Sequence, residues 1–167
     1  MSLNIALVAH DARKQEMIEW VTYNIHVLKE HNLYATGTTG KLIMNAFYES
    51  ELPNIHAWDE ESFINGIKEH YKDNITCLLS GPLGGDSQIG SMIAEGKIDV
   101  LIFFCDNLIT QGHQQDVGAL SRLASLYNIA FATNRTTADM ILTSNLFDNK
   151  DYVRVIPSAI ESYKNRM

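Results

Sequence analysis

Short hydrophobic runs recur along the 167-residue chain, and stretches with apolar residues at helical spacing separate them. Runs of this kind, bounded by turn residues, predict buried β-strands, and the spaced positions predict helices. The six candidate strands are residues 3–9, 32–36, 75–80, 100–105, 129–133 and 152–157. Continuous apolar runs that alternate with helices favour a parallel sheet covered on both faces. The pattern therefore predicts an α/β fold with a doubly wound, mostly parallel sheet.

The connection between the second and third candidate strands is longer than a single crossover helix requires. Between Ile43 and Ile75 the chain has about thirty residues, where a crossover helix needs about a dozen. We expect a helical insertion at about 45–74, with one amphipathic helix over residues 59–71. The simplest interpretation is an extra helix over the sheet edge, and a lid or a subunit contact is the alternative.

Composition and charge narrow the class of protein. A hydrophobic content of 46% in 18.8 kDa, without repeats or linkers, predicts one domain over residues 1–167. The net charge of −7 and the lack of any basic cluster argue against nucleic-acid and membrane-surface partners. No apolar run reaches the ~18 residues of a membrane span, and the N-terminus lacks a basic signal-peptide region. With Cys77 and Cys105 interpreted as reduced core thiols, we expect a cytoplasmic protein.

Polar, chemically capable residues follow the first four candidate strands. In open α/β sheets the ligand lies beyond the carboxyl ends of the strands, so these residues are expected to face one crevice. They are His10, Asp11 and Lys14 after the first strand, Thr36, Gly37, Thr38 and Thr39 after the second, Ser80, Gly81 and Asp86 after the third, and Asp106, His113 and Asp116 after the fourth.

The run Thr36 to Gly40 has the chemistry of an oxyanion cradle. Three hydroxyls and the N–H groups of a helix N-terminus all donate to phosphate, and four or five charge-assisted bonds at about 1.5–3 kcal/mol each hold one firmly. The alternative is a strand end that only caps a helix, but a second hydroxyl-bearing turn at Ser80 favours the cradle. No Walker A or GxGxxG motif is present, which argues against nucleotides.

The histidines and carboxylates of the crevice fit proton transfer better than metal binding. The pairs His10-Asp11 and His113-Asp116 match no sharp zinc spacing and no cysteine joins them, so we expect no metal. Several carboxylates with two histidines suit general acid–base chemistry. Asp86, at the tip of a glycine-rich loop, is the candidate general base.

Five segments and the single residue Asp106, in order along the chain, resemble the methylglyoxal synthase family. They are IALVAHD, LYATGTTG, LSGPLGGD, IAEGKIDVLIFF with the Asp106 that follows, and ATNRTTAD. The resemblance implies a Rossmann-like domain, a homohexamer, and conversion of dihydroxyacetone phosphate to methylglyoxal and inorganic phosphate without a cofactor. The chain differs from the family at Asn107 and at Gln114-Gln115, where proline-containing pairs are usual, and in its long 45–74 segment.

The resemblance also implies roles for the crevice residues. Asp86 is the base that forms an enediolate, and His10 and His113 donate to its oxygens. Asp106 and Asp116 orient donors or relay protons, and Asp11 supports His10 or the loop. Substrate contacts fall on His10, Lys14, Thr36, Gly37, Thr38, Thr39, Ser80, Gly81 and His113. Arg122 and Arg166 are candidates for sensing inorganic phosphate, the product and a potential inhibitor, across subunits, with surface ion pairs as the plainer interpretation.

Two other functions remain open at this point. A non-catalytic regulatory module that binds a phosphorylated metabolite needs the cradle but not Asp86, His113 or Asp116. A triose phosphate isomerase-like enzyme with the same base gives an aldehyde without releasing phosphate.

Overall fold

Five parallel strands form one sheet in the computed structural model, which describes residues 2–51, 74–108 and 114–166, with the backbone alone at 51 and 114–116. The strands are β1 (Asn4–Ala9), β2 (Asn32–Thr36), β3 (Ile75–Leu78), β4 (Val100–Phe104) and β5 (Ala130–Ala132). Their order across the sheet is β3-β2-β1-β4-β5. In register, Leu7 lies opposite Ala35 on one side and Ile102 on the other.

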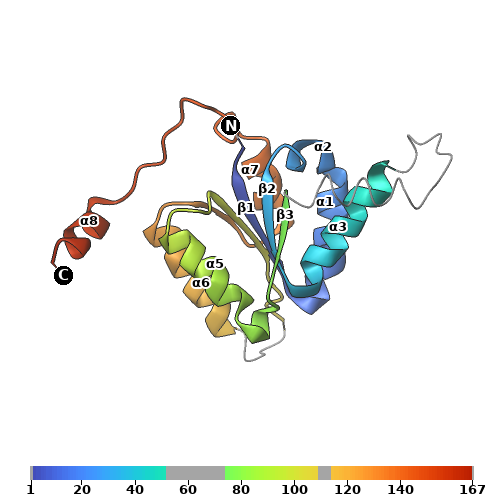
Figure 1. The fold of residues 1–167 in the computed structure, drawn as a ribbon, viewed down its shortest axis with the longest axis horizontal. Coiled ribbons are helices and arrows are strands. Elements are labelled where there is room, and N and C mark those ends of the chain that lie inside the picture. Colours follow the sequence, from blue (N-terminus) through green and yellow to red (C-terminus); the bar gives the residue numbers. More distant parts are fainter. Residues whose placement is uncertain (1, 52–73, 109–113, 167) are drawn as a thin grey trace.

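Helices cover both faces of this sheet (Figure 1). On one face lie α1 (Lys14–Tyr23), α2 (Ile25–Leu28), α3 (Gly37–Glu51) and α7 (Arg135–Leu142), and on the other lie α5 (Gly85–Ala94) and α6 (Gln114–Leu126). Two single-turn 3-10 helices, η1 (Asp11–Arg13) and η3 (Gly81–Leu83), follow β1 and precede α5, and α8 (Ser158–Lys164) is near the C-terminus. The predicted doubly wound, Rossmann-like α/β fold is therefore confirmed.

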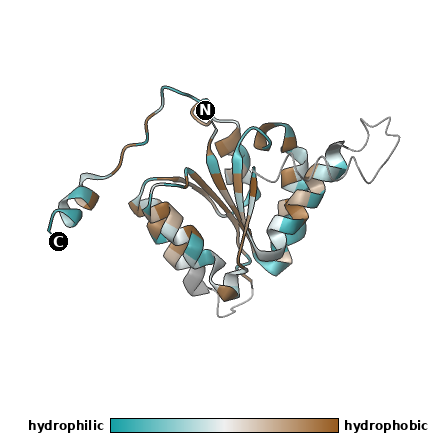
Figure 2. Ribbon diagram, in the orientation of Figure 1, coloured by the Kyte–Doolittle hydropathy of each residue, from teal (hydrophilic) through white to brown (hydrophobic). Residues whose placement is uncertain are grey.

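Alternate residues of the buried strands build two hydrophobic clusters. Successive strand side chains point to opposite faces of a sheet. Ile5 and Leu7 of β1 accordingly pack with Trp20 of α1 on one face, whereas Ala6 packs with Ile89 of α5 on the other. Figure 2 shows hydrophobic residues gathered along the strands, between helices of mixed polarity. This two-sided burial explains why the strands read as continuous apolar runs.

The chain order places a topological switch point beside β1. From β1 the chain moves outward through β2 to β3, and then crosses to β4 on the opposite side of β1. The connections that leave β1 and β4 therefore run to opposite faces, which opens a crevice at the carboxyl ends of these strands. His10 and Asp106 lie at those ends.

The sixth candidate strand is not part of the sheet. Residues 152–157 have no regular secondary structure and lead to α8, which stands away from the sheet (Figure 1). The segment is held at its middle, because the Arg154 guanidinium donates to the Ile98 carbonyl (3.1 Å) and the Asn128 amide donates to the Val155 carbonyl (2.9 Å). Strand propensity made these residues look like a strand, but no neighbouring strand pairs with them among the described residues.

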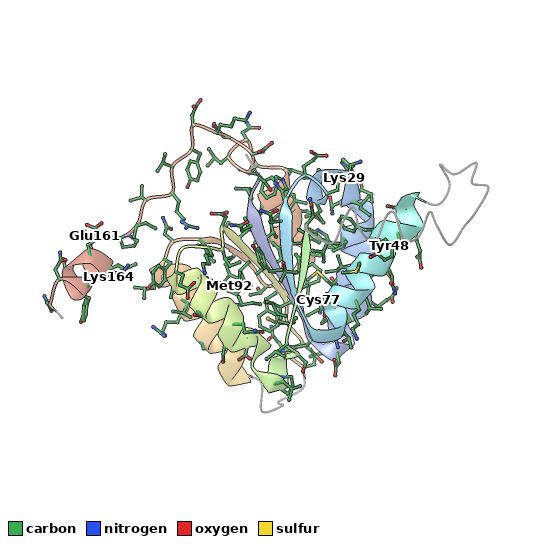
Figure 3. The ribbon with its side chains drawn as sticks, viewed as in Figure 1. Lys29, Tyr48, Cys77, Met92, Glu161 and Lys164 are labelled. Carbon is green, nitrogen blue, oxygen red and sulfur yellow. The ribbon has the colours of Figure 1, made fainter. Side chains whose placement is uncertain are left out.

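Two other expectations have mixed outcomes. Of the 45–74 insertion, residues 45–51 are the end of α3, whereas 52–73 lie outside the described residues. Cys105 is buried as expected, but the prediction that Cys77 is a core thiol is wrong, because β3 is at the edge of the sheet and leaves Cys77 exposed. Figure 3 shows Cys77 on this strand, beside α3.

Within residues 2–51, 74–108 and 114–166, no helix combines the length and hydropathy that a membrane span requires.

Candidate active site

A cavity of about 440 Å³ opens at the carboxyl ends of the central strands. Each predicted catalytic or substrate-binding residue whose side chain is described lines it. These residues are His10, Asp11, Lys14, Thr36, Gly37, Thr38, Thr39, Ser80, Gly81, Asp86 and Asp106. Four segments far apart in the sequence thus meet at one site, as the parallel topology predicts.

His10 is held in one orientation and one tautomer. The backbone N–H of Asp106 donates to its Nδ1 at 2.8 Å, so in the neutral ring the proton lies on Nε2. Phe103 packs against the ring edge to face, with centroids 5.1 Å apart. Nε2 is buried and has no partner among the described residues. An N–H donor is therefore ready for an oxygen atom of a ligand in the cavity.

Lys14 connects two segments of the cavity wall. Its Nζ donates to Oδ1 of Asp11 at 2.6 Å and to Oγ1 of Thr38 at 2.7 Å. The Lys14 side chain is about one quarter exposed (27%), whereas that of Asp11 is almost fully exposed (95%). The ammonium group thus lies at the N-terminus of α3, where a cation adds to the attraction for an anion.

The first turn of α3 has the features of an anion cradle. The first N–H groups of a helix have no partners within that helix, and they carry its partial positive charge. Thr39, in this turn, lines the cavity and is 99% buried, and its Oγ1 has no partner among the described residues. Because an unsatisfied buried hydroxyl is costly, this atom indicates a missing polar ligand.

The two hydroxyl-bearing turns are in direct contact. The N–H of Gly37 donates to the carbonyl of Leu79 at 3.1 Å. Gly37 has a φ of +49°, and a Cβ built on it would lie 2.9 Å from the Cα of Ser80. Only glycine meets both conditions without strain. Ser80 is thereby held against the first turn of α3.

Asp86 and Asp106 enter the cavity from different elements. Asp86 is in the first turn of α5, directly after the turn closed by Gly84 and Gly85. Asp106 follows β4, and its Oδ1 accepts a hydrogen bond from the N–H of Leu108 at 3.0 Å. This local bond shapes the loop that presents the Asp106 N–H to His10.

Of the remaining predicted residues, Arg122 and Arg166 do not line the cavity, and the side chains of His113 and Asp116 are not described. Arg122 lies exposed on α6, and Arg166 lies exposed beyond α8 with its guanidinium 5.2 Å from the ring centroid of Tyr163. His113 lies outside the described residues. Asp116 lies near the start of α6, where the structure describes only the backbone.

An apolar wall of the cavity was not anticipated from the sequence. It is made by Val8, Ala9, Ala12, Pro82 and Phe103. Val8 and Phe103 lie within strands and look like ordinary core residues, because periodicity does not show which core side chains border a cavity. Of these five residues, only Pro82 could have been expected near the site from the sequence, because it lies in the turn of Ser80. The wall limits the water around the polar groups, which strengthens their electrostatic interactions.

The described residues of the site include no metal-binding cluster and no reactive thiol. Among the described residues, no group of three His, Cys, Asp or Glu is placed to hold a metal ion. Cys105 is adjacent to Asp106, but burial raises the pKa of its thiol to about 11. A thiol that stays protonated is a poor nucleophile.

Comparisons with known proteins agree with this arrangement. The family model described as MGS-like domain matches residues 16–133. Methylglyoxal synthase of Yersinia enterocolitica is 46% identical over 147 residues, covering 88% of this chain and 81% of the relative, and that of Proteus mirabilis is 44% identical over 152 residues, covering 91% and 84%. The crystal structure of methylglyoxal synthase from Elizabethkingia anophelis NUHP1 superposes with a TM-score of 0.73 at 38% identity, over 98% of this chain and 91% of that one. This chain is an enzyme of the methylglyoxal synthase family.

Proposed function

We propose that this enzyme is a carbon–oxygen lyase that converts dihydroxyacetone phosphate to methylglyoxal and inorganic phosphate. One observation carries the proposal: a single cavity holds the carboxylate of Asp86 together with two hydroxyl-bearing turns and Lys14. A base and a phosphate cradle in one small cavity suit a short phosphorylated ketone. The names of the relatives support the same reaction.

In the proposed first step, Asp86 takes a proton from the hydroxymethyl carbon beside the ketone. The electron pair of that C–H bond moves toward the carbonyl oxygen and forms an enediolate. The Nε2–H of His10 donates to a developing oxyanion, as in other sites where fixed donors meet new negative charge. By family resemblance His113 donates to the second oxygen, Asp106 and Asp116 orient the donors or relay protons, and Asp11 supports His10 or the loop.

In the second step the enediolate expels phosphate. Its π electrons form a new C=C bond to the carbon that carries the phosphate, the C–O bond to phosphate breaks, and the phosphate leaves with that electron pair. At the other end the terminal hydroxyl gives up its proton as its oxygen forms the aldehyde C=O bond. The enol product then takes a proton on its methylene carbon to give methylglyoxal. All atoms come from the substrate, and the reaction needs no oxidant or reductant. The step requires the C–O bond to stand perpendicular to the enediolate plane, so the grip on the phosphate decides the outcome.

The proposed grip uses Thr38, Thr39, Ser80 and Lys14 with the N–H of Gly81. Gly37, whose N–H is bound to the Leu79 carbonyl, lines the cavity beside Thr36. The unpartnered Oγ1 of Thr39 supports this role most directly. Charge-assisted hydrogen bonds of about 1.5–3 kcal/mol each hold a phosphate in spite of the net charge of −7.

An assay of two products tests the function. Purified protein incubated with dihydroxyacetone phosphate should release phosphate and a dicarbonyl in equal amounts. Asp86→Asn should lose both products and still bind inorganic phosphate, because the cradle is unchanged. No turnover by the wild type would favour the regulatory module, and an aldehyde without phosphate release would favour the isomerase-like reaction.

We also propose a cytoplasmic homohexamer whose activity responds to inorganic phosphate. Support for assembly comes from the C-terminal arm (residues 152–166), whose exposed apolar residues include Tyr152, Val153 and Val155. Arg122 and Arg166 do not line the cavity of their own chain. A role in phosphate sensing therefore needs a second copy. Light scattering with and without phosphate, for the wild type and Arg166→Ala, tests whether the protein is a hexamer and whether phosphate changes its assembly through Arg166.

A further inference from the structure

The backbone of Leu79 is held from two sides. Its N–H donates to Oε1 of Gln88 at 2.9 Å, and its carbonyl accepts the N–H of Gly37 at 3.1 Å. The first residue of α5, Gly85, lies so close that a Cβ there would be 1.9 Å from the Leu79 oxygen. Three contacts, from α3, from α5 and from one side chain, thus fix the position at which the chain leaves β3.

Gln88 belongs to the helix that carries Asp86. Its own N–H donates to the carbonyl of Gly84 at 3.0 Å, so its backbone is part of the first turns of α5. Ser80, the residue after Leu79, belongs to the phosphate cradle. The side-chain bond from Gln88 to Leu79 therefore ties the cradle to the helix of the base.

We propose that Gln88 is a positioning residue that fixes the Ser80 turn relative to Asp86. This role rests on the proposed function. In this role Gln88 helps to align the phosphate ester bond of the substrate, although its side chain does not contact the substrate. The side chain is the link that a substitution can remove, because the bond from Gly37 is between backbone groups.

The two ends of the loop from Leu79 to Asp86 respond differently when the hydrogen bond between Leu79 and Gln88 is lost. Asp86 stays in the first turn of α5, whose backbone hydrogen bonds do not involve Leu79. Leu79 loses one of its two hydrogen bonds and gains freedom, whereas the Ser80 carbonyl still accepts the N–H groups of Leu83 and Gly85, both at 3.0 Å. Proton removal should therefore continue, while the geometry for expelling phosphate is reached less often. The enediolate that keeps its phosphate is reprotonated from solvent.

A pair of matched variants tests this role. Gln88→Met keeps the length of the side chain and removes the acceptor, whereas Gln88→Glu keeps an oxygen that accepts from Leu79. In Gln88→Met we expect kcat for phosphate release to fall about five- to tenfold, the loss of one modest hydrogen bond. Exchange of solvent deuterium into the triose should continue, so the ratio of exchange to release rises. In Gln88→Glu, kcat should stay within about twofold of wild type. The comparison uses kcat because an added charge near an anion site raises KM.

Three results would overturn the role of Gln88. They are phosphate release at the wild-type rate in Gln88→Met, an equal loss of exchange and release, and a loss in Gln88→Glu as large as in Gln88→Met. Amide hydrogen exchange at Leu79 gives a readout that does not depend on turnover. If the wild type released no phosphate, the proposed function would fail. Faster exchange at Leu79 in Gln88→Met than in Gln88→Glu would still support the anchoring, and equal exchange would overturn it.

Discussion

The backbone N–H of Asp106 donates to Nδ1 of His10 at 2.8 Å, across the carboxyl ends of the neighbouring strands β4 and β1. This bond leaves the ring proton on Nε2, the nitrogen that is buried without a partner among the described residues. His10 therefore supplies the donor, and the backbone N–H of Asp106 decides which nitrogen of the ring donates.

Replacement of His10 by asparagine should separate these two roles. The amide oxygen of asparagine lies near the position of Nδ1 and keeps the bond from Asp106, but its side chain does not reach as far as Nε2. We expect kcat to fall about 100- to 1,000-fold, the usual cost of losing one oxyanion donor. Steady-state kinetics measures the loss. A melting temperature near that of wild type would show that the fold is kept, and an unchanged kcat would exclude His10 as the donor.

Replacement of Thr39 by valine should weaken anion binding without weakening the fold. The change is nearly isosteric, and Oγ1 has no partner among the described residues, so no described hydrogen bond is lost. Loss of one charge-assisted bond raises the Kd for inorganic phosphate about tenfold to a hundredfold. Titration calorimetry measures this change. Thr76→Val, at an exposed position of β3, should leave the Kd unaltered.

Replacement of Gly85 by alanine should damage both stability and activity. The new Cβ would lie 1.9 Å from the Leu79 oxygen and 3.0 Å from Cγ2 of Thr36, so the loop that carries Ser80 must move. We expect a loss of about 1–3 kcal/mol in the free energy of unfolding and at least tenfold in kcat.

Gly118→Ala is the control for that substitution. This exposed glycine lies within α6, and a Cβ built on it meets no atom within 4 Å. Alanine there should stabilise the protein by up to about 1 kcal/mol, since glycine is a poor helix former. Urea denaturation of both variants measures the contrast. Equal effects of the two substitutions would contradict the close approach of Gly85 to Leu79.

His31 should make the free energy of unfolding depend on pH. It is 3% exposed, its Nδ1 accepts the N–H of Leu3 at 3.2 Å, and Phe147 packs on its ring. Burial lowers the pKa of His31 from 6.5, although the charge of Asp148 opposes this shift. The unfolded chain therefore binds a proton more readily than the folded one. Stability is full above about pH 6.5 and falls as the pH drops below that value toward the folded-state pKa.

Urea denaturation between pH 7.5 and pH 5 measures this dependence. His31→Asn keeps an acceptor for Leu3 but does not titrate in this range, so its free energy of unfolding should change less with pH than that of wild type. An identical pH dependence in the two proteins would rule out His31 as the source.

The two thiols should react slowly in the folded protein. Burial raises the pKa of both Cys105 and Cys77, in the case of Cys105 to about 11. Cys77 is nevertheless exposed, so iodoacetamide at pH 7.5 should label it slowly and should label Cys105 only after unfolding. Mass spectrometry of peptides locates the label. Rapid labelling of Cys105 would contradict its burial.

Much of the fold could be read from the sequence because local patterns reflect burial. β1, β2, β3, β4 and β5 all coincide with predicted apolar runs, since strands covered on both faces carry apolar side chains at most positions. The polar residues after these runs were predicted to converge for a topological reason, because carboxyl ends of parallel strands meet at one edge. One domain over residues 1–167 stays a prediction, as do the catalytic roles.

The two errors concern positions that a local pattern does not fix. Residues 152–157 have the β-branched composition of a strand, but a strand also needs a free edge to pair with, and Arg154 and Asn128 hold this segment elsewhere. Cys77 lies in an apolar run, but the order of strands places β3 at the edge, where part of its surface is exposed.

The sequence by itself thus determined the five strands, their parallel arrangement and the polar residues that line the cavity, because hydrophobic periodicity and chain order depend only on neighbours along the chain. Only the tertiary structure decided which atoms meet: the tautomer of His10, the bond from Lys14 to Thr38, and the hold of Gln88 on Leu79. These contacts join residues from separate elements. Their distances and directions follow from how the helices pack on the sheet, and no spacing in the sequence encodes them.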